Sequence, residues 1–283
     1  MPRVLLGLMA ALAVAAGPAL EDEIAQWRRA RASTLQAEGG WLTVAGLFWL
    51  HEGANSFGKD PASEIVLPDG PAQAGVFDLR AGTVAVTMKA EGARRELQPD
   101  SSDVVKAGRL SLFLIKRGDR LGIRLKDPEN PARKEFHGLD YFPASEAYRV
   151  TARWVASPRQ IPVLNVLGQT EPSQCPGYAE FRIGETDLRL YPILEEPDAQ
   201  ELFYIFRDQT SGRETYPAGR FLYSGLPKEG RVVLDFNKAV NPPCAFTPYA
   251  TCPLPPPENR LPVRIEAGEK KYHEIRFRLR PPP

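Results

Sequence analysis

Polar side chains gather in two stretches of the carboxy-terminal half, and together they could bind or act on a small polar molecule. The first stretch, FRDQTSGRETYPAGRF, covers residues 206–221 and contains Asp208, Thr210 and Arg220. The second surrounds a proline-rich loop, with Asp235, Asn237 and Asn241 before it and Asn259 and Glu269 after it. Because sequential strands usually lie side by side, the two stretches are expected to converge at one sheet end and form a pocket. The residues expected to meet there are Asp208, Arg220, Asp235 and Asn237.

Two kinds of role follow for these side chains. A hydrolytic reaction needs a general base, and the carboxylates of Asp208 and Asp235 are the candidates. The residues expected to bind a small polar ligand are Thr210, Arg220, Asn237, Asn241, Asn259 and Glu269. The alternative is structural, because aspartate and asparagine cap turns and residues 206–221 alone are typical of an ordinary hairpin.

The loop between these stretches carries Cys244 and Cys252, for which three chemistries are open. In an oxidising compartment the pair would form a disulfide, which stabilises a fold by about 2.6 kcal/mol on a chain-entropy model. A metal site would need further ligands, and no histidine lies close by in the sequence. Cys244 could instead be a catalytic nucleophile whose base comes from elsewhere in the fold. A third cysteine, Cys175, is left free or competes for pairing.

Proline is unusually frequent, with 28 residues, and eight of them fall between positions 242 and 262. Prolines lower the entropy of the unfolded chain, so they make it easier to hold a long irregular loop in one shape. Long ordered loops usually serve a function. We therefore expect this loop to fold back over the sheet end and enclose the pocket.

Several other chemistries find no support. The chain has no glycine-rich phosphate loop and no Gly-x-Ser-x-Gly nucleophile motif. Its three histidines, His51, His137 and His273, are too scattered for a zinc site of the HExxH type, and no metal or cofactor is expected. With 36 basic and 35 acidic residues, the charge is nearly balanced, so no nucleic-acid partner is expected.

The elements that must position these residues are mostly strands. One helix is expected from Leu20 to the pair Gly39-Gly40, because apolar residues recur at helical spacing after an acidic first turn. The period then changes to two: Leu121, Ile123 and Leu125 alternate with Arg120, Arg124 and Lys126, which predicts a half-buried strand. Residues 117–119, RGD, are the expected turn between it and RLSLFLIK.

Further short strands follow, nearly all bounded by Gly, Pro or Asp. They are YRVTARWV, IPVLNVLG, YAEFRI, DLRLYPIL, LFYIFRD, RFLYSGL and RVVLDFN. Short strands at this spacing favour sandwiches or barrels over alternating strand–helix units. The predicted fold class is mostly β, with an amino-terminal helix followed by two β-rich domains.

The domain boundaries follow from the same patterns. Residues 1–19 have one basic residue, a short apolar run and small residues, which is typical of a secretory signal peptide. Residues 20–128 would hold the helix and a first β-sandwich, 129–147 a proline-containing linker, and 148–283 a second β domain, a sandwich or barrel. Alternation of Ile, Phe and Leu with arginine over 275–280 indicates one further strand. The mature protein is expected in the periplasm or outside the cell, without stable membrane insertion after cleavage.

Several long motifs resemble the bacterial family known as domain of unknown function 1684. They are GWLTVAGLFWLHEGANSFGKDPASEIVLP, FRDQTSGRETYPAGRFL, VVLDFNKAVNPPCAFTPYATCPLPPPENRL and IEAGEKK. The resemblance implies no established activity. It implies that ten residues belong to the family's motifs: Asp208, Thr210, Gly212, Arg220, Asp235, Asn237, Asn241, Cys244, Cys252 and Asn259.

The amino-terminal region is similar to a forkhead-associated sandwich. Residues 55–87 contain Gly58-Lys59-Asp60 and EIVLP in the expected order, whereas PAQAGVF stands where that family has Ser-x-x-His. The resemblance therefore implies a β-sandwich without the phosphothreonine-binding element.

Two functions are open at this point. The first is an exported protein whose carboxy-terminal β domain binds or hydrolyses a small polar ligand. The second is a non-catalytic envelope protein that docks onto a protein partner through its forkhead-like sandwich.

Overall fold

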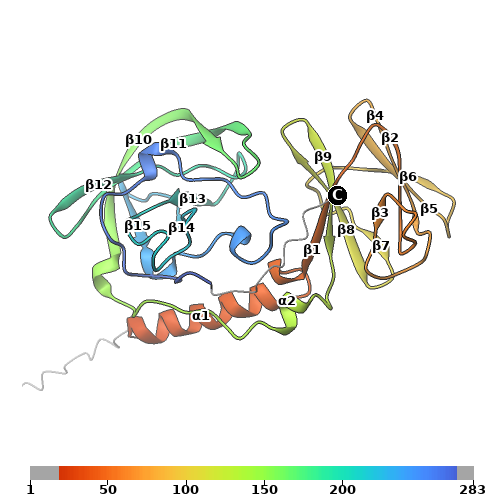
Figure 1. Cartoon of the computed structure of the whole chain (residues 1–283). Helices are drawn as coiled ribbons and strands as arrows, with labels where there is room; N and C mark the ends of the chain where they lie inside the picture. Colours follow the sequence, from red (N-terminus) through yellow and green to blue (C-terminus); the bar gives the residue numbers. More distant parts are fainter. Residues whose placement is uncertain (1–18, 273–283) are drawn as a thin grey trace, which may run out of the picture.

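The computed structural model describes residues 19–272. It contains two β-rich units side by side, with a single long helix beneath the carboxy-terminal unit (Figure 1). The mostly-β fold class predicted from the sequence is confirmed. The signal peptide predicted over 1–19 and the strand predicted over 275–280 lie outside the described residues, save for Ala19.

The amino-terminal unit, here called the sandwich, packs two sheets around one core. One sheet has the order β1 (Val44–Trp49), β9 (Arg120–Lys126), β8 (Leu110–Arg117) and β7 (Val105–Ala107). The other has the order β3 (Ile65–Val66), β2 (Gly53–Gly58), β4 (Gly75–Arg80), β5 (Thr83–Met88) and β6 (Arg94–Leu97). Phe57 and Phe77 stack at the centre of the core, with ring centroids 4.3 Å apart.

The β8–β9 hairpin forms as predicted, with Arg117 opposite Arg120 and a tight turn at Gly118, whose φ is +55°. Leu121, Ile123 and Leu125 are buried in the sandwich core. The opposite face of β9 was expected to be solvent-exposed, but Arg124 is only 8% exposed. The strand is therefore buried on both faces, because segments from the other unit cover it.

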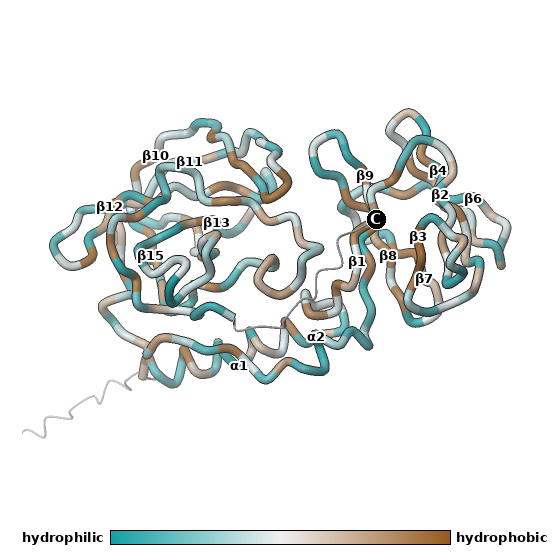
Figure 2. Tube along the Cα trace, viewed as in Figure 1, coloured by the Kyte–Doolittle hydropathy of each residue, from teal (hydrophilic) through white to brown (hydrophobic). Residues whose placement is uncertain are grey.

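The carboxy-terminal unit has a four-stranded sheet and a two-stranded sheet. The larger sheet has the order β12 (Thr186–Leu190), β11 (Thr170–Ile183), β10 (Arg149–Leu164) and β15 (Arg231–Asp235), and the smaller one pairs β13 (Glu201–Phe206) with β14 (Arg220–Gly225). The two strands predicted over 148–155 and 161–168 form one long strand, β10, whose register shifts between Ala156 and Arg159. Apolar residues concentrate along the strands, while the β8–β9 tip is hydrophilic (Figure 2).

Short helical turns connect these elements. They are α2 (Pro131–Lys134) and the 3₁₀ turns η1 (Trp41–Thr43), η2 (Glu146–Tyr148), η3 (Phe236–Lys238), η4 (Pro243–Ala245) and η5 (Pro257–Asn259). The turn η3 directly precedes the proline-rich loop, and η4 and η5 lie within it, so this loop is folded and not extended.

The helix α1 (Leu20–Gln36) forms where it was predicted. The sequence boundaries grouped it with the sandwich, but its polar contacts reach the carboxy-terminal unit. Glu23 accepts hydrogen bonds from Arg149 and Lys238, each at 2.7 Å, and Arg31 pairs with Glu269 at 2.9 Å. Long-range ion pairs of this kind cannot be inferred from helical periodicity.

The predicted linker over 129–147 is an ordered part of the structure. Phe136 and Phe142 are buried, and Tyr141 forms a β-bridge with Glu269. Within residues 19–272, no helix is both long and apolar enough to cross a membrane.

Candidate functional site

Asp208, Thr210 and Arg220 meet as predicted, but they do so inside the protein. Arg220 lies 3.5 Å from Asp208, and both side chains have no exposed area. Asp208 also accepts hydrogen bonds from Thr210 Oγ1 at 2.8 Å and from the backbone N–H of Ile265 at 2.7 Å. Arg220 donates to the carbonyl oxygens of Ile265, at 3.0 Å, and Ala267. This cluster fixes the segment 265–267 against β14.

Asp208 is therefore not placed to act as a general base in the described structure. Such a base must come within hydrogen-bonding reach of a substrate, and this carboxylate is enclosed and fully engaged. Burial lowers the pKa of Arg220, and the nearby charge of Asp208 opposes that effect.

Asp235 and Asn237 belong to a second network. Arg149 binds Asp235 with Nε at 3.0 Å and Nη2 at 2.8 Å, and Asn237 Nδ2 donates to the same carboxylate at 2.9 Å. Asn237 also exchanges two hydrogen bonds of 2.9 Å with the backbone of Ser145. Within residues 19–272, no hydrogen bond or ion pair joins this network to the Asp208–Arg220 cluster. The predicted four-residue convergence is therefore not formed, because each pair is tied to a different backbone segment.

The remaining predicted ligand-binding residues also hold backbone. Glu269 accepts from Arg31 and, at 2.6 Å, from the N–H of Asn241, whose side chain donates to the carbonyl of Lys270 at 2.8 Å. Asn259 exchanges two bonds of 2.8 Å with the backbone of Tyr191. These residues therefore fasten the long irregular segment 236–270 to helix α1 and to the sheets.

In the described structure all three cysteines are free thiols, so it does not contain the disulfide predicted from cysteine spacing. The turn η4 instead directs the N–H of Cys244 onto the sulfur of Cys252, 3.1 Å away. A hydrogen bond from Cys252 and the charge of Arg124 help to lower the pKa of Cys244. Cys175 is buried in the carboxy-terminal unit and donates its thiol to the carbonyl of Gly177 at 3.1 Å.

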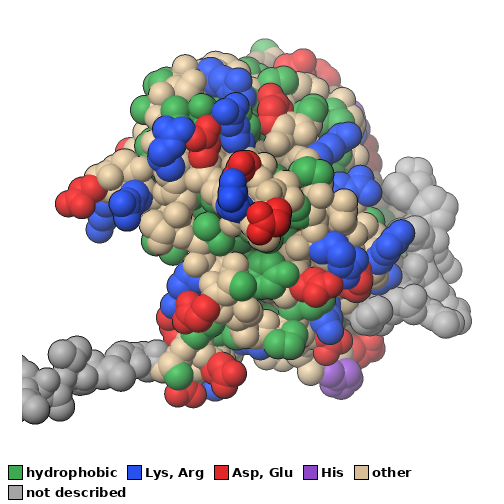
Figure 3. Space-filling view, turned by 90° about the vertical axis from the view of Figure 1, so that its left-hand side faces the viewer, with side chains coloured by type: hydrophobic (Ala, Val, Ile, Leu, Met, Phe, Trp, Pro, Cys, Tyr) green, Lys and Arg blue, Asp and Glu red, His purple; other side chains and the backbone are tan. Residues whose placement is uncertain are grey.

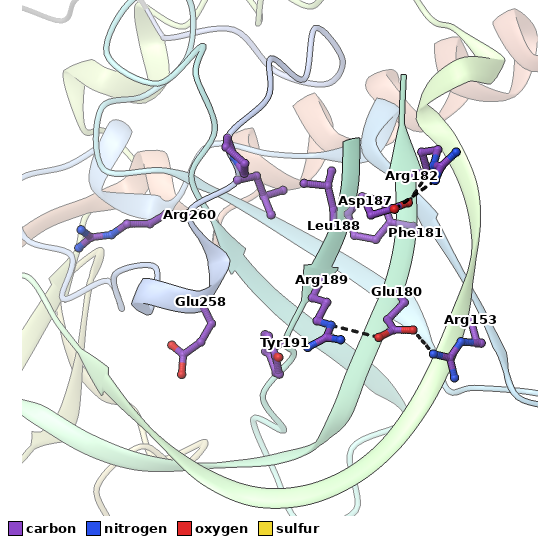
Figure 4. A pocket seen from close by; sticks show the side chains of 12 residues that line it. Arg153, Glu180, Phe181, Arg182, Asp187, Leu188, Arg189, Tyr191, Glu258 and Arg260 are labelled. Atoms are coloured by element: carbon purple, nitrogen blue, oxygen red, sulfur yellow. Dashed lines mark hydrogen bonds and ion pairs between the residues drawn. The ribbon is translucent and has the colours of Figure 1, made fainter. Parts of the chain in front are cut away.

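Two hollows remain as candidate sites, and the larger is a charged cleft of about 890 Å³ beside β11, β12 and η5 (Figure 4). Its charges largely neutralise one another. Glu180 pairs with both Arg153 and Arg189, and Arg182 pairs with Asp187 at 2.8 Å. Basic and acidic side chains are also interleaved over the face turned away from the sandwich (Figure 3). Exposed ion pairs of this kind are screened by solvent and contribute little energy, and they leave few free charges for a ligand.

The second hollow is a cavity of about 320 Å³ between the sandwich and the carboxy-terminal unit, here called the interface cavity. Its residues come from α1, η1, β8, β9, the segment between β12 and β13, β13, β14, and the proline-rich loop with the residues just before it. Of the predicted site residues, Asn241 and Cys252 line it. The loop thus encloses a cavity, although most of the polar residues expected there are engaged elsewhere.

Three arginines line the interface cavity, and two of them have acidic partners. Arg31 pairs with Glu269, and Arg117 pairs with Asp100 at 3.0 Å. The third, Arg124, has no carboxylate within ion-pair distance among the described residues. Arg124 is thus the distinctive cation of the cavity.

Arg124 is held in place by weak contacts alone. Its Nη2 lies 3.4 Å from Thr251 Oγ1, its guanidinium carbon lies 5.1 Å from the centroid of Trp41, and its buried Nε has no hydrogen-bond partner. Burial, followed by the charge of Arg117, lowers the pKa of Arg124 to about 10. At neutral pH Arg124 is still a cation. It lines the cavity, and its guanidinium can donate further hydrogen bonds there.

Sequence reasoning missed Arg124 and Arg117. Both lie in a hairpin whose alternation predicted an exposed polar face, and no local signal indicates that Thr251 and its neighbours cover that face. Among residues 19–272, no three His, Cys, Asp or Glu side chains gather in a way that could hold a metal ion.

Comparison with known proteins places part of the chain in a family. Residues 134–270 match the family model described as "Protein of unknown function (DUF1684)", so the family assignment holds for that part of the chain. The motif expected over 40–68 lies outside the match, and no match supports the forkhead-associated resemblance.

Among solved structures, the chain is similar to an uncharacterized protein from Haloarcula marismortui determined by solution NMR. The two are 30% identical, the similarity covers 50% of this chain and 80% of that one, and the TM-score is 0.41. No curated protein matches the chain. The family is described as one of unknown function and the solved protein as uncharacterized, so neither brings an activity to this chain.

Proposed function

We propose that this chain, whose residues 134–270 carry the DUF1684 signature, binds a small anionic molecule in the interface cavity. One observation carries the proposal: the guanidinium of Arg124 is buried against the cavity and has no carboxylate partner among the described residues. A buried charge without a partner destabilises a fold. A carboxylate or phosphate in the cavity would supply that partner, and Arg117 would add a second cation.

The proposal is one of binding and not of hydrolysis. None of the three residues expected to be catalytic, Asp208, Asp235 and Cys244, lines the interface cavity. The cavity is also within the size range of small-molecule sites, which begins at about 300 Å³. A volume of this order suits a metabolite-sized molecule.

Isothermal titration of the full chain with benzoate and with phenyl phosphate tests this proposal. We expect at least one of these anions to bind, and we expect Arg124→Gln to weaken that binding by about tenfold or more, the effect of losing a charge-assisted hydrogen bond. The control is Arg182→Gln, an exposed arginine of the charged cleft that pairs with Asp187. Equal affinity in the wild type and Arg124→Gln, or no binding of either anion, overturns the proposal.

We also propose that the chain is exported and that Cys244 and Cys252 become a disulfide in the oxidising compartment. The leader pattern of residues 1–19 and the proximity of the two cysteines support this. Amino-terminal sequencing of protein purified from the periplasm should give a start near residue 20. Thiol titration of the same material should leave only Cys175 reactive after denaturation, and three reactive thiols would contradict the disulfide.

A further inference from the structure

The interface cavity is lined by charges of both signs. The sandwich contributes Arg117 and Arg124 from β8 and β9, and Thr251 joins them by accepting a hydrogen bond from Arg117 Nε at 2.8 Å. The carboxy-terminal unit contributes Glu195, which follows β12 and lies at the exposed rim. An anion that binds to the arginines would therefore extend toward a carboxylate.

Glu195, like Arg124, has no ion-pair partner in the described part of the chain, although Glu195 is exposed and Arg124 is buried. Among residues 19–272, no lysine or arginine lies within ion-pair distance of it. Partial burial, followed by the like charges of Glu196 and Glu201, raises the pKa of Glu195. An ammonium group beside Glu195 would offset this repulsion, as Coulomb's law requires.

Aromatic rings also line the interface cavity. Phe203 packs edge-on against Phe221 and stacks on Tyr223, with both pairs of ring centroids 4.8 Å apart. All three residues line the cavity. Such a surface favours an apolar spacer, and the face of an aromatic ring also attracts an ammonium group.

From this arrangement we infer that the ligand is a zwitterion with separated charges. A carboxylate or phosphate binds to Arg124 and Arg117, a short apolar spacer packs on Phe203 and its neighbours, and an ammonium binds to Glu195. The volume of about 320 Å³ limits the spacer to a few carbon atoms or one ring. An ω-amino acid and a short peptide with free termini share this chemistry. The inference rests on the proposed function and specifies its ligand.

Three matched probes test the inference by isothermal titration of the full chain: benzoate, benzylamine and 4-(aminomethyl)benzoate. We expect the zwitterion to bind about tenfold more tightly than either half, the gain of one added charge-assisted contact. Glu195→Gln should abolish that advantage and leave benzoate affinity unchanged. Glu196→Gln is the matched control, because Glu196 is the adjacent exposed glutamate and does not line the cavity.

Failure of this inference can be told from failure of the proposed function. If 4-(aminomethyl)benzoate and benzoate bind equally, both depend on Arg124 and neither responds to Glu195→Gln, then the zwitterion is wrong and the anion site stands. If no probe depends on Arg124, the proposed function itself is wrong. If the zwitterion is supported, titration with 6-aminohexanoate and with glycyl-phenylalanine distinguishes an ω-amino acid from a short peptide. The compound that binds more tightly identifies the ligand class.

Discussion

Arg124 and Arg220 are both buried arginines, but their surroundings give them opposite effects on stability. Arg220 has a buried carboxylate partner, Asp208, and donates to two backbone carbonyls. Arg124 has a threonine hydroxyl at 3.4 Å and an aromatic ring, and its Nε is unpaired. Arg220 therefore completes the fold, whereas Arg124 has no charged partner among the described residues.

This contrast predicts the effect of replacing each arginine by methionine. Arg220→Met should lower the free energy of unfolding by about 3–5 kcal/mol, because it leaves a buried carboxylate without its partner. Arg124→Met should leave the ligand-free protein unchanged or slightly more stable, since it removes a buried charge that has no partner. Urea unfolding measures both values. An Arg124→Met variant as unstable as Arg220→Met would show that Arg124 is structural.

At the scale of elements, the proline-rich region and the segment after it form a strap over the sheets. Gly268 lies closely against the turn η3, with φ at +77° and its backbone against the carbonyls of Ala239 and Phe236. A Cβ added there would lie 2.5 Å from the oxygen of Ala239 and 2.8 Å from that of Phe236. The strap therefore needs glycine at this position for two reasons, backbone conformation and space.

At Gly212 only the first of these reasons, the backbone conformation, applies. Its φ is +88°, but a Cβ there would meet nothing within 4 Å. Gly212→Ala should cost about 1 kcal/mol, the strain of a positive φ alone. Gly268→Ala should cost clearly more, because backbone oxygens cannot move aside. Thermal unfolding of the two variants gives the comparison. Equal losses of stability would mean that the backbone around Gly268 can shift to accommodate a Cβ at little cost.

At the scale of the whole molecule, Glu269 joins helix α1 to the loop that closes the interface cavity. It is fully buried and accepts hydrogen bonds from Arg31 and from Asn241 N–H. Burial raises the pKa of Glu269 above its ordinary value of 4.5, although Arg31 opposes this. The native state therefore holds this proton more tightly than the unfolded chain. Its contribution to stability is present at low pH and is lost as the pH rises through the raised pKa.

Glu269→Gln should remove this dependence, because glutamine does not titrate, although its NH2 group replaces one of the two acceptor oxygens. The stability of the variant relative to the wild type should therefore rise as the pH increases from below 4.5 toward neutrality. Glu266→Gln serves as the control, because Glu266 is exposed and pairs with Arg264. Urea unfolding at a series of pH values gives the curves. A relative stability of the variant that falls as the pH rises would show that the ion pair with Arg31 outweighs burial.

Local patterns in the sequence determined much of the fold. Apolar spacing predicted helix α1, the alternation of Leu121, Ile123 and Leu125 predicted β9, and the RGD tripeptide predicted its turn. These predictions succeed because an element's apolar face and its turn residues lie within a few positions of one another. The pairing of Asp208 with Arg220 also followed, since they lie at the adjoining ends of β13 and β14, which neighbour each other.

Only the tertiary structure decided which polar residues face a cavity and which are enclosed. The sequence placed Asp208, Asp235, Asn237 and Asn259 at a pocket, whereas each of them fastens a distant backbone segment. It placed Arg124 on an open face, whereas the carboxy-terminal loop covers that face and leaves a hollow beside it. Periodicity reports which face of an element is apolar. It carries no information about which remote segment will lie over a polar face, because that depends on the packing of the whole chain.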